Sequence, residues 1–364
     1  MRYWIFSFAL ILYAAGYVSD IFFVPDHWPP VVYDYSKNQM TPSKVDLGRV
    51  LFYDPLLSKD YSISCASCHS PFSAFAHTDH DLSHGIFDSI GTRNAPALMN
   101  LAWQSSFMWD GAIHHLDMQA LAPITHPSEM GSSIDTVVNR LNKLSKYHQL
   151  FDKAYGNPEA TGEKTLKAIS QFMLTLVSAN SKYDLVMAQK DTFTLQESNG
   201  YTLFKRNCAS CHAEPLFTTH QFANNGLPID SSLRDMGRYN ITLDSSDAYK
   251  FKIPTLRNIE YTYPYMHDGR FKKLSQVLRH YTSGLEQSNT ISDPLKQTII
   301  LSSNEQVDII AFLLTLSDKE FVFNKKFQYP HQYSDNKIKL RLSQNLIFCV
   351  LIHYFFATLG QYHS

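Results

Sequence analysis

The chain has 364 residues, enough for about two domains of ordinary size. Hydrophobic residues make up 44% and charged residues 18%, which excludes a disordered chain and allows an ordinary apolar core. The 32 basic residues nearly balance the 33 acidic ones, for a formal net charge of −1. This balance argues against a nucleic-acid binder, which needs a cationic face.

The first twenty residues have the pattern of an export signal. Arg2 precedes an apolar run from Ile5 to Tyr17 that ends in small residues. The run is shorter than the roughly 20 apolar residues that a membrane span needs. We therefore predict a signal over residues 1–20, either cleaved or kept as an anchor. The next stretch, 24–43, is rich in proline, aspartate and serine and is predicted to be an extended arm.

Two copies of the pattern Cys-x-x-Cys-His follow along the chain. They are Cys65-Ala66-Ser67-Cys68-His69 and Cys208-Ala209-Ser210-Cys211-His212. Two thiols one helical turn apart can reach the two vinyl groups on one edge of a haem, and the adjacent histidine can bind the iron. The sequence therefore predicts two covalently attached c-type haems, with His69 and His212 as proximal ligands. Bacteria attach such haems outside the cytoplasm, so the motifs agree with export and predict a periplasmic protein.

Three alternatives explain these motifs less well. A thioredoxin-like redox pair does not need a histidine after the second cysteine. A zinc site made of four cysteines would join two pairs that lie far apart in the chain and would leave both histidines unexplained. Structural disulfides do not explain the repeated histidine either, and the fifth cysteine, Cys349, stands alone near the C-terminus.

A helical pattern precedes each motif. Residues 44–53 and residues 195–204 both place apolar side chains at helical spacing. They share a glycine, a leucine and a phenylalanine at matching positions: Gly48, Leu51 and Phe52 in the first, Gly200, Leu203 and Phe204 in the second. The similarity predicts an internal duplication and a mainly α fold of two cytochrome c-like helical domains, each with one covalently attached haem.

We place the first haem domain at residues 24–185 and the second at residues 191–325. Residues 163–178 predict a helix with one buried face in the first domain, and its Met173 is assigned to core packing rather than to haem ligation. Residues 304–316 predict the closing helix of the second domain.

Residues 335–364 form an extra tail of unknown role. Its apolar stretch, 346–359, is short for a membrane span. It could be a helix packed on the body, an unstructured tail, or a membrane-surface helix behind the basic residues 337–341. Membrane contact is therefore expected only through the two termini.

The chain resembles the bacterial di-haem cytochrome c peroxidases, whose fold is shared by the methylamine-utilisation protein MauG. The resemblance covers residues 40–325 and includes, besides the haem motifs, five segments: 93–96 (RNAP), 107–111 (FMWDG), 127–131 (PSEMG), 254–258 (PTLRN) and 264–269 (PYMHDG). It implies reduction of hydrogen peroxide to water, with electrons from a small periplasmic cytochrome c or cupredoxin, and a possible homodimer. The alternatives are a MauG-like oxidase acting on another protein and a non-enzymatic electron-transfer cytochrome.

The resemblance also implies roles for individual residues. The first haem, on His69, is the peroxide site, and the second, on His212, receives electrons. Glu129 matches the distal glutamate that moves a proton between the peroxide oxygens. Gln119 matches a second polar residue of that pocket, and Trp109 matches the tryptophan between the two haems.

Further ligands follow from the same resemblance. Asn94, with the backbone carbonyls of Thr262 and Pro264, matches a calcium site between the domains. His84 is the expected distal ligand of the first haem, although His77 and His80 lie close by in sequence. Tyr281 falls where the peroxidases have a methionine and MauG a tyrosine as sixth ligand of the second haem, with His280 as the alternative.

Overall fold

The computed structural model describes residues 22–331. The predicted export signal and the C-terminal tail with Cys349 lie outside the described residues. The body considered below ends at Gln328, and the three described residues after it belong to a separate unit. Among the described residues, no helix is long and apolar enough to cross a membrane.

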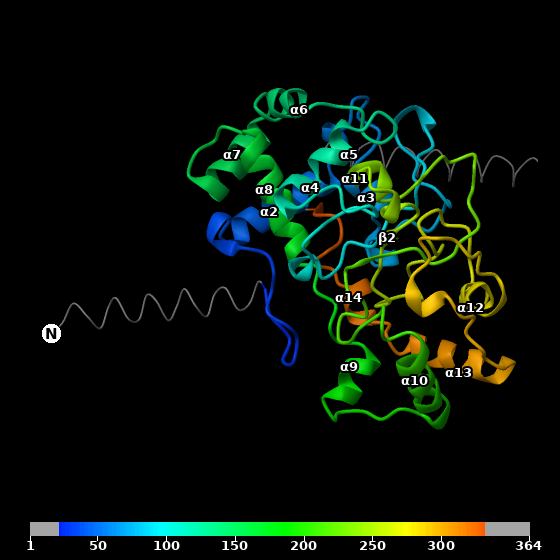
Figure 1. The fold of residues 1–364 in the computed structure, drawn as a ribbon. Helices are drawn as coiled ribbons and strands as arrows, with labels where there is room; N and C mark the ends of the chain where they lie inside the picture. Colours follow the sequence, from blue (N-terminus) through cyan, green and yellow to red (C-terminus); the bar gives the residue numbers. More distant parts are fainter. Residues whose placement is uncertain (1–21, 332–364) are drawn as a thin grey trace, which may run out of the picture. The chain divides into compact units, whose positions relative to one another are not determined.

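The described body is mainly helical, as predicted (Figure 1). The α-helices of the first half are α2 (Pro42–Tyr53), α3 (Cys65–Cys68), α4 (Leu116–Gln119), α5 (Leu121–Thr125), α6 (Ile134–Leu141), α7 (Ser145–Tyr155), α8 (Gly162–Leu174) and α9 (Lys182–Met187). Those of the second half are α10 (Leu195–Asn207), α11 (Tyr239–Thr242), α12 (Leu274–Ser283), α13 (Ser303–Leu314) and α14 (Lys319–Val322). Two short strands, β1 (Phe222–Ala223) and β2 (Phe251–Lys252), pair in antiparallel register.

Short 3₁₀ turns connect these elements. They cover Tyr35–Lys37, Pro55–Leu57, Pro71–Ser73, Ile86–Asp88, Leu101–Trp103, Ser245–Asp247 and Asp293–Leu295. The turn Ile86–Asp88 closes a hairpin between the first haem motif and Asn94, and this hairpin bears on the site described below.

The two halves repeat one helix crossing. In Figure 1, α2 crosses α8 in the upper left of the view and α10 lies against α13 in the lower right. Gly48 of α2 lies so close to α8 that an added Cβ would be 2.6 Å from Ala168 C and 3.1 Å from Phe172 Cβ. Gly200 of α10 would place a Cβ 2.6 Å from Asp308 C and 2.9 Å from Phe312 Cβ. The matched glycines of the sequence therefore occupy equivalent positions in two equivalent helix pairs.

Local sequence explains where these helices begin. Thr41 accepts a hydrogen bond from Lys44 N and precedes Pro42, so α2 has both a capping side chain and a proline in its first turn. Thr194 caps α10 in the same way, and Glu197 completes a capping box. Each helix then buries its leucine and phenylalanine: Leu51 and Phe52, Leu203 and Phe204.

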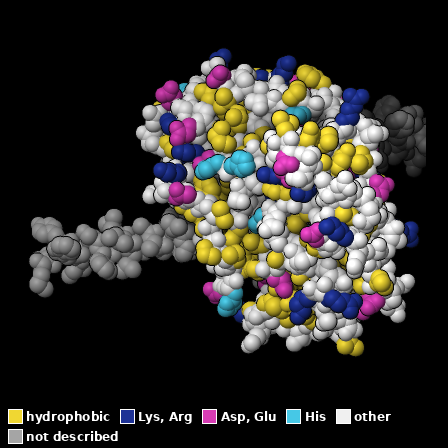
Figure 2. Space-filling view, viewed as in Figure 1, with side chains coloured by type: hydrophobic (Ala, Val, Ile, Leu, Met, Phe, Trp, Pro, Cys, Tyr) yellow, Lys and Arg dark blue, Asp and Glu magenta, His cyan; other side chains and the backbone are white. Residues whose placement is uncertain are grey.

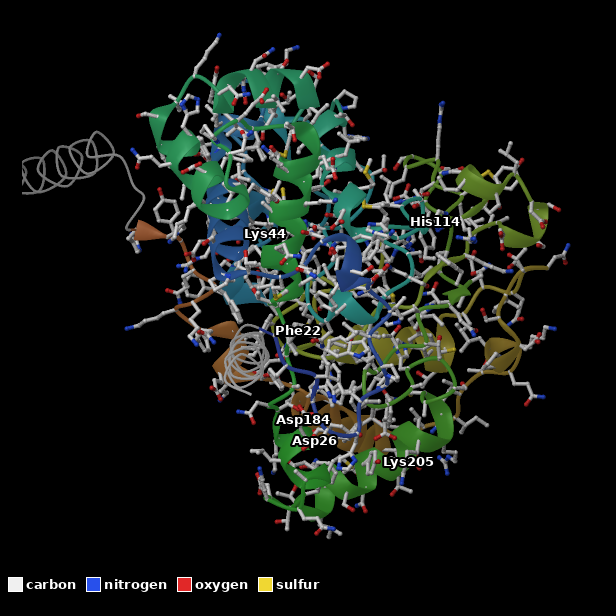
Figure 3. The ribbon with its side chains drawn as sticks, turned by 90° about the vertical axis from the view of Figure 1, so that its left-hand side faces the viewer. Phe22, Asp26, Lys44, His114, Asp184 and Lys205 are labelled. Carbon is white, nitrogen blue, oxygen red and sulfur yellow. The ribbon has the colours of Figure 1, made fainter. Side chains whose placement is uncertain are left out.

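The predicted arm contacts both halves of the body. Pro29 O accepts a hydrogen bond from Trp103 Nε1 at 2.8 Å in the first half. The Trp28 ring packs edge-on against Trp103 at 4.8 Å and stacks under the Arg257 guanidinium at 4.7 Å in the second half. Figure 3 shows Asp26 of the arm, and Phe22 just before it, on the face turned to the viewer.

Candidate haem sites

The first haem motif forms α3. Ser64 and Ser67 cap this single turn through a hydrogen bond from Ser64 N to Ser67 Oγ of 3.0 Å. His69 donates Nδ1–H to Phe75 O at 2.8 Å, which leaves Nε2 to bind iron. Burial lowers the pKa of His69 to about 4, so the imidazole is neutral and available as a ligand at neutral pH.

A cavity of about 480 Å³ opens beside this motif. Its lining includes Cys65, Cys68 and His69 together with two polar side chains, Gln119 and Glu129. The other lining residues are mostly apolar: Phe52, Ile63, Ser64, Leu98, Ala120, Pro123, Met130, Ile169 and Met173. Two thiols, an imidazole and apolar walls in one cavity fit a covalently bound haem. The structure thus brings together four segments that lie far apart in the sequence.

Glu129 is the acidic group of this cavity. Burial raises the pKa of its carboxyl group, and the nearby His126, with Nδ1 3.8 Å from Glu129 Oε1, partly opposes that rise. A carboxyl group whose pKa is raised holds its proton more readily than an ordinary glutamate and can both accept and return one. Gln119, at the end of α4, places its amide nitrogen 3.9 Å from Met108 Sδ.

The three histidines near the motif contact one another: His84 stacks on His80, and His77 is tilted against His80. His84 lies 4.0 Å from His80 between ring centroids, and His80 lies 5.4 Å from His77. The His84 ring also places Nδ1 3.4 Å from Asp88 Oδ1. The backbone of His84 approaches the haem motif, with its carbonyl oxygen 3.4 Å from Cys68 Sγ. Its ring is not among the residues that line the described cavity.

The second haem motif begins at the end of α10. His212 donates from Nδ1 to Phe217 O and Pro254 O, both at 3.2 Å, which again leaves Nε2 for iron. Burial lowers the pKa of His212 to about 4. The histidines of the two motifs, His69 and His212, thus both bond to backbone carbonyls through Nδ1 and both have a pKa lowered by burial.

Tyr281 of α12 lies near this second motif. Burial raises the pKa of its phenol to about 12, while a hydrogen bond with the Asn225 side chain acts in the opposite direction. The cysteines 208 and 211 are within electrostatic reach of the same phenol. Its neighbour His280 instead directs Nε2 at Asn225 O, 2.9 Å away. Of the two predicted alternatives, Tyr281 is thus the side chain next to the cysteine pair.

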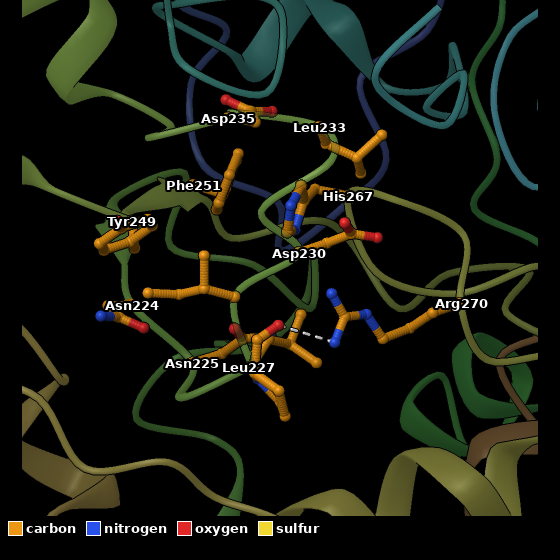
Figure 4. A pocket seen from close by; sticks show the side chains of 12 residues that line it. Asn224, Asn225, Leu227, Asp230, Leu233, Asp235, Tyr249, Phe251, His267 and Arg270 are labelled. Carbon is orange, nitrogen blue, oxygen red and sulfur yellow. Dashed lines mark hydrogen bonds between the residues drawn. The ribbon is translucent and has the colours of Figure 1, made fainter.

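A second cavity, of about 350 Å³, adjoins Asn225 (Figure 4). The His267 ring stacks on Phe251 at 3.7 Å along its wall, and Arg270 donates to Pro228 O at 2.8 Å. Because Asn225 contacts both this cavity and Tyr281, the cavity belongs to the surroundings of the second haem motif. Sequence analysis did not identify Asn225, and an isolated amide gives no signal that could have done so.

An ion pair of Arg93 joins the two halves. Arg93 contacts Asp235 through Nε at 2.6 Å and Nη2 at 2.8 Å, and its Nη1 contacts Asp110 at 2.6 Å. Trp109 donates Nε1–H to Asn94 O at 2.9 Å, and its carbonyl oxygen accepts from Lys252 N at 2.7 Å. Trp109 therefore lies at the junction, bonded to the first half on one side and to β2 on the other.

Lys252 is a buried amine that the sequence analysis missed. Burial lowers the pKa of its ammonium group to about 8. Its Nζ donates to Gln104 Oε1 at 2.9 Å and to Ser106 O at 2.7 Å. The lysine thus ties β2 to the segment that leads into Trp109, and its burial depends on tertiary contacts that a single sequence does not reveal.

The calcium ligands implied by the resemblance lie in neighbouring segments. Asn94 N donates to His267 O at 2.7 Å, close to the chain that carries Thr262 and Pro264. The Asn94 amide nitrogen donates to Asp81 O, which leaves its amide oxygen for a cation. Within residues 22–331 no cluster of three or more His, Cys, Asp or Glu side chains could hold a metal ion. A calcium ion here would thus depend on amide and carbonyl oxygens, which suit that cation.

Comparison with known proteins agrees with this geometry. Residues 42–192 match the family model described as di-haem cytochrome c peroxidase, and residues 197–317 match the cytochrome c model. The methylamine utilization protein MauG of Methylorubrum extorquens is 38% identical over 291 residues, which cover 77% of this chain and 79% of that protein. The cytochrome c551 peroxidase of Nitrosomonas europaea is 35% identical over 291 residues, which cover 76% and 82%.

A solved structure agrees with these sequence matches. A MauG-like protein associated with microbial copper homeostasis superposes with a TM-score of 0.77 at 30% identity, covering 84% of this chain and 98% of that one. The helical fold and the two Cys-x-x-Cys-His motifs define a di-haem c-type cytochrome. More closely, the chain belongs to the di-haem cytochrome c peroxidase family, in which MauG is also found. Membership implies two c-type haems.

Proposed function

We propose that the protein is a periplasmic peroxidase that reduces hydrogen peroxide to water at the first haem. The observation that carries this proposal is the presence of Glu129, a half-buried carboxyl group with a raised pKa, in the cavity of the first haem motif. A purely electron-transferring cytochrome does not need an acid–base group there. The bound haem would supply the iron that binds and reduces the peroxide.

The side chains of the cavity supply the proton chemistry. Glu129 accepts a proton from one peroxide oxygen and returns it to the other, which leaves as water when the O–O bond breaks. Two electrons and two protons complete the conversion of one peroxide into two waters. Gln119 contributes an amide that orients the peroxide. The apolar walls limit the access of water and so strengthen these polar contacts.

Electrons would arrive one at a time from a small cytochrome c or cupredoxin. The second haem, held by His212, is their point of arrival, and Trp109 offers a route toward the first because it is bonded to both halves of the body. A calcium ion on Asn94, Thr262 and Pro264 would stabilise this junction. Each of these roles depends on residues at the boundary between the halves.

The test is steady-state peroxide turnover with a reduced small cytochrome, comparing the wild type with Glu129→Gln. Loss of a general acid–base group costs about 10²–10⁴-fold in rate. We expect a fall of that size with unchanged haem content. An unchanged rate would show that Glu129 does not move the proton.

A second candidate function is favoured by Tyr281. A phenolate on the second haem stabilises ferric iron and lowers its potential, which suits a MauG-like oxidase better than an enzyme that accepts electrons readily. Such an enzyme would use the same first haem to oxidise a partner protein. High turnover with a cytochrome donor supports the peroxidase, whereas slow turnover together with peroxide-dependent oxidation of a protein partner supports the oxidase.

A further inference from the structure

We propose that Gly85 positions the carboxyl group of Glu129. The absence of a side chain at this residue lets a hairpin, residues 83–91, contact the backbone that carries Glu129. The inference rests on the proposed function, because it deepens the account of the same site. It assigns Gly85 a positioning role, since the residue would act only through Glu129.

The contact at Gly85 is closer than any other residue type allows. A Cβ at this position would overlap the carbonyl oxygens of Ser128 and Glu129 and would lie 2.5 Å from Glu129 Cα. The backbone angles of Gly85, φ −117° and ψ −156°, are open to every residue. The requirement for glycine is therefore one of space and not of conformation.

A second contact follows directly in sequence. Ile86 N donates to Glu129 O at 2.8 Å. The Ile86 side chain is 2% exposed, and its Cδ1 fills the space that a Cβ on Gly131 would need. The pair Gly85–Ile86 thus contacts the chain before, at and after Glu129, and we call this pair the seat of Glu129.

The seat is itself well supported. Gly91 N donates to Ser83 O at 2.8 Å and Gly85 N donates to Ser89 O at 2.9 Å, so the two strands of the hairpin are bonded together. The turn between them is closed by Ser89 N donating to Ile86 O at 3.1 Å. Glu129 lies in the loop between α5 and α6, where its own N donates to His126 O at 3.1 Å, Met130 N donates to Pro123 O at 3.1 Å and Gly131 N donates to His126 O at 2.9 Å. Both sides of the contact are therefore held by backbone hydrogen bonds, so an added Cβ at residue 85 has to displace main-chain atoms of one side or the other.

The functional consequence follows from the geometry of proton transfer. A catalytic group must lie within hydrogen-bond reach of the proton that it moves. A misplacement of about 1 Å can cost about 10²-fold in rate. An alanine at residue 85 cannot be accommodated without moving the Ser128–Glu129 backbone or the hairpin that contacts it, because both overlapping atoms are main-chain atoms.

The test compares Gly85→Ala with Gly91→Ala in the same hairpin. At Gly91 an added Cβ would meet first the hydroxyl of Ser83, which can rotate away. We expect Gly85→Ala to lower kcat/KM for peroxide by about 10²-fold, with haem content unchanged. Gly91→Ala should retain the wild-type rate.

A spectroscopic measurement separates positioning from general damage. Carbon monoxide bound to the dithionite-reduced protein has a C–O stretching frequency that responds to a nearby carboxyl group. Gly85→Ala and Glu129→Gln should both shift this frequency, and Gly91→Ala should not. The double variant Gly85→Ala/Glu129→Gln should be no slower than Glu129→Gln alone, because Gly85 acts through the carboxyl group.

The outcomes distinguish this inference from the proposed function. A wild-type rate and frequency in Gly85→Ala, while Glu129→Gln is slow, would overturn the positioning role alone. An additive loss in the double variant would do the same. A wild-type rate in Glu129→Gln would instead overturn the proposed function.

A second variant is used if Gly85→Ala does not accumulate with haem. Ile86→Val removes the contact with Gly131 and should shift the C–O stretching frequency less, but with the same sign. A wild-type spectrum of Ile86→Val would overturn the inference.

Discussion

At the scale of single residues, burial decides in which pH range Glu129 can act. Burial raises the pKa of its carboxyl group, with His126 partly opposing the rise. A base must be ionised, so kcat/KM should fall on acidification at a pH above the ordinary glutamate value of about 4.3. His126→Ala removes the opposing charge and should move this fall to higher pH. Glu129→Gln should lack this fall of kcat/KM on acidification. A profile that is the same in all three proteins would contradict the assignment.

Tyr281 permits a second prediction at this scale. If its phenolate binds the second haem, Tyr281→Met should raise the midpoint potential of that haem and change its low-spin spectrum, because a thioether stabilises ferric iron less. The control is Tyr265→Phe. It removes another tyrosine hydroxyl of the second half, one that donates a hydrogen bond to Ile259 O at 3.0 Å. Potentiometric titration measures both variants. An identical low-spin signal in Tyr281→Met would show that this side chain does not bind iron.

These residues differ in how far the sequence alone reveals them. The haem cysteines and His69 were predicted from spacing, because covalent attachment requires them to be neighbours. Glu129 and Tyr281 required a family resemblance, since each comes close to its haem motif from a distant segment. Asn225 and Lys252 gave no sequence signal at all, because only tertiary burial gives an ordinary amide or amine its special environment.

At the scale of helices, the close crossing of α10 and α13 predicts that a substitution of Gly200 destabilises the protein. A methyl group there would meet the α13 backbone at Asp308, and overpacking of this kind costs about 1–3 kcal/mol. Gly200→Ala should therefore lower the free energy of unfolding by about that amount. Asn199→Ala, at the exposed adjacent position of α10, should leave stability nearly unchanged. Denaturant unfolding of the haem-loaded protein measures both, and equal stability of the two variants would contradict the close crossing.

The helices themselves were largely predictable, while the irregular segments were not. The helix expected at 44–53 begins at Pro42, because Thr41 caps it and Pro42 favours its first turn. The spacing of apolar residues does not indicate such a cap. The helix expected at 163–178 ends at Leu174, and that expected at 304–316 covers Ser303–Leu314. The pair of two-residue strands and the hairpin over 83–91 were missed, because so few residues give no periodic pattern.

At the scale of the whole molecule, Arg93 joins the two halves. Burial opposes ionisation of Asp235, but the hydrogen bonds and charge of Arg93 outweigh it and hold the pKa of Asp235 below its usual value. Removing one partner of a mostly buried pair costs about 3 kcal/mol. Arg93→Met should lose about that much stability near neutral pH. Lys296→Met, at an exposed ion pair with Asp293, should change little.

The Arg93–Asp235 pair also predicts how the stability of the protein changes on acidification. The lowered pKa of Asp235 means that its contribution is present above the unfolded value of about 3.9 and is lost as pH falls through the folded-state value. The stability difference between wild type and Arg93→Met should therefore shrink on acidification. Urea unfolding at several pH values measures this, and a constant difference would contradict the pairing.

The contact of Trp28 with Arg257 can form only after synthesis of the chain has reached residue 257. A ribosome produces the tryptophan long before the arginine, so Trp28 lacks its Arg257 partner until about half of the second half has been synthesised. The arm can pack on Trp103 earlier, but it completes its contacts only when Arg257 is present. A nascent chain that ends before residue 257 should therefore leave one face of the Trp28 ring uncovered, and fuller protection of its indole would report that Arg257 has been synthesised.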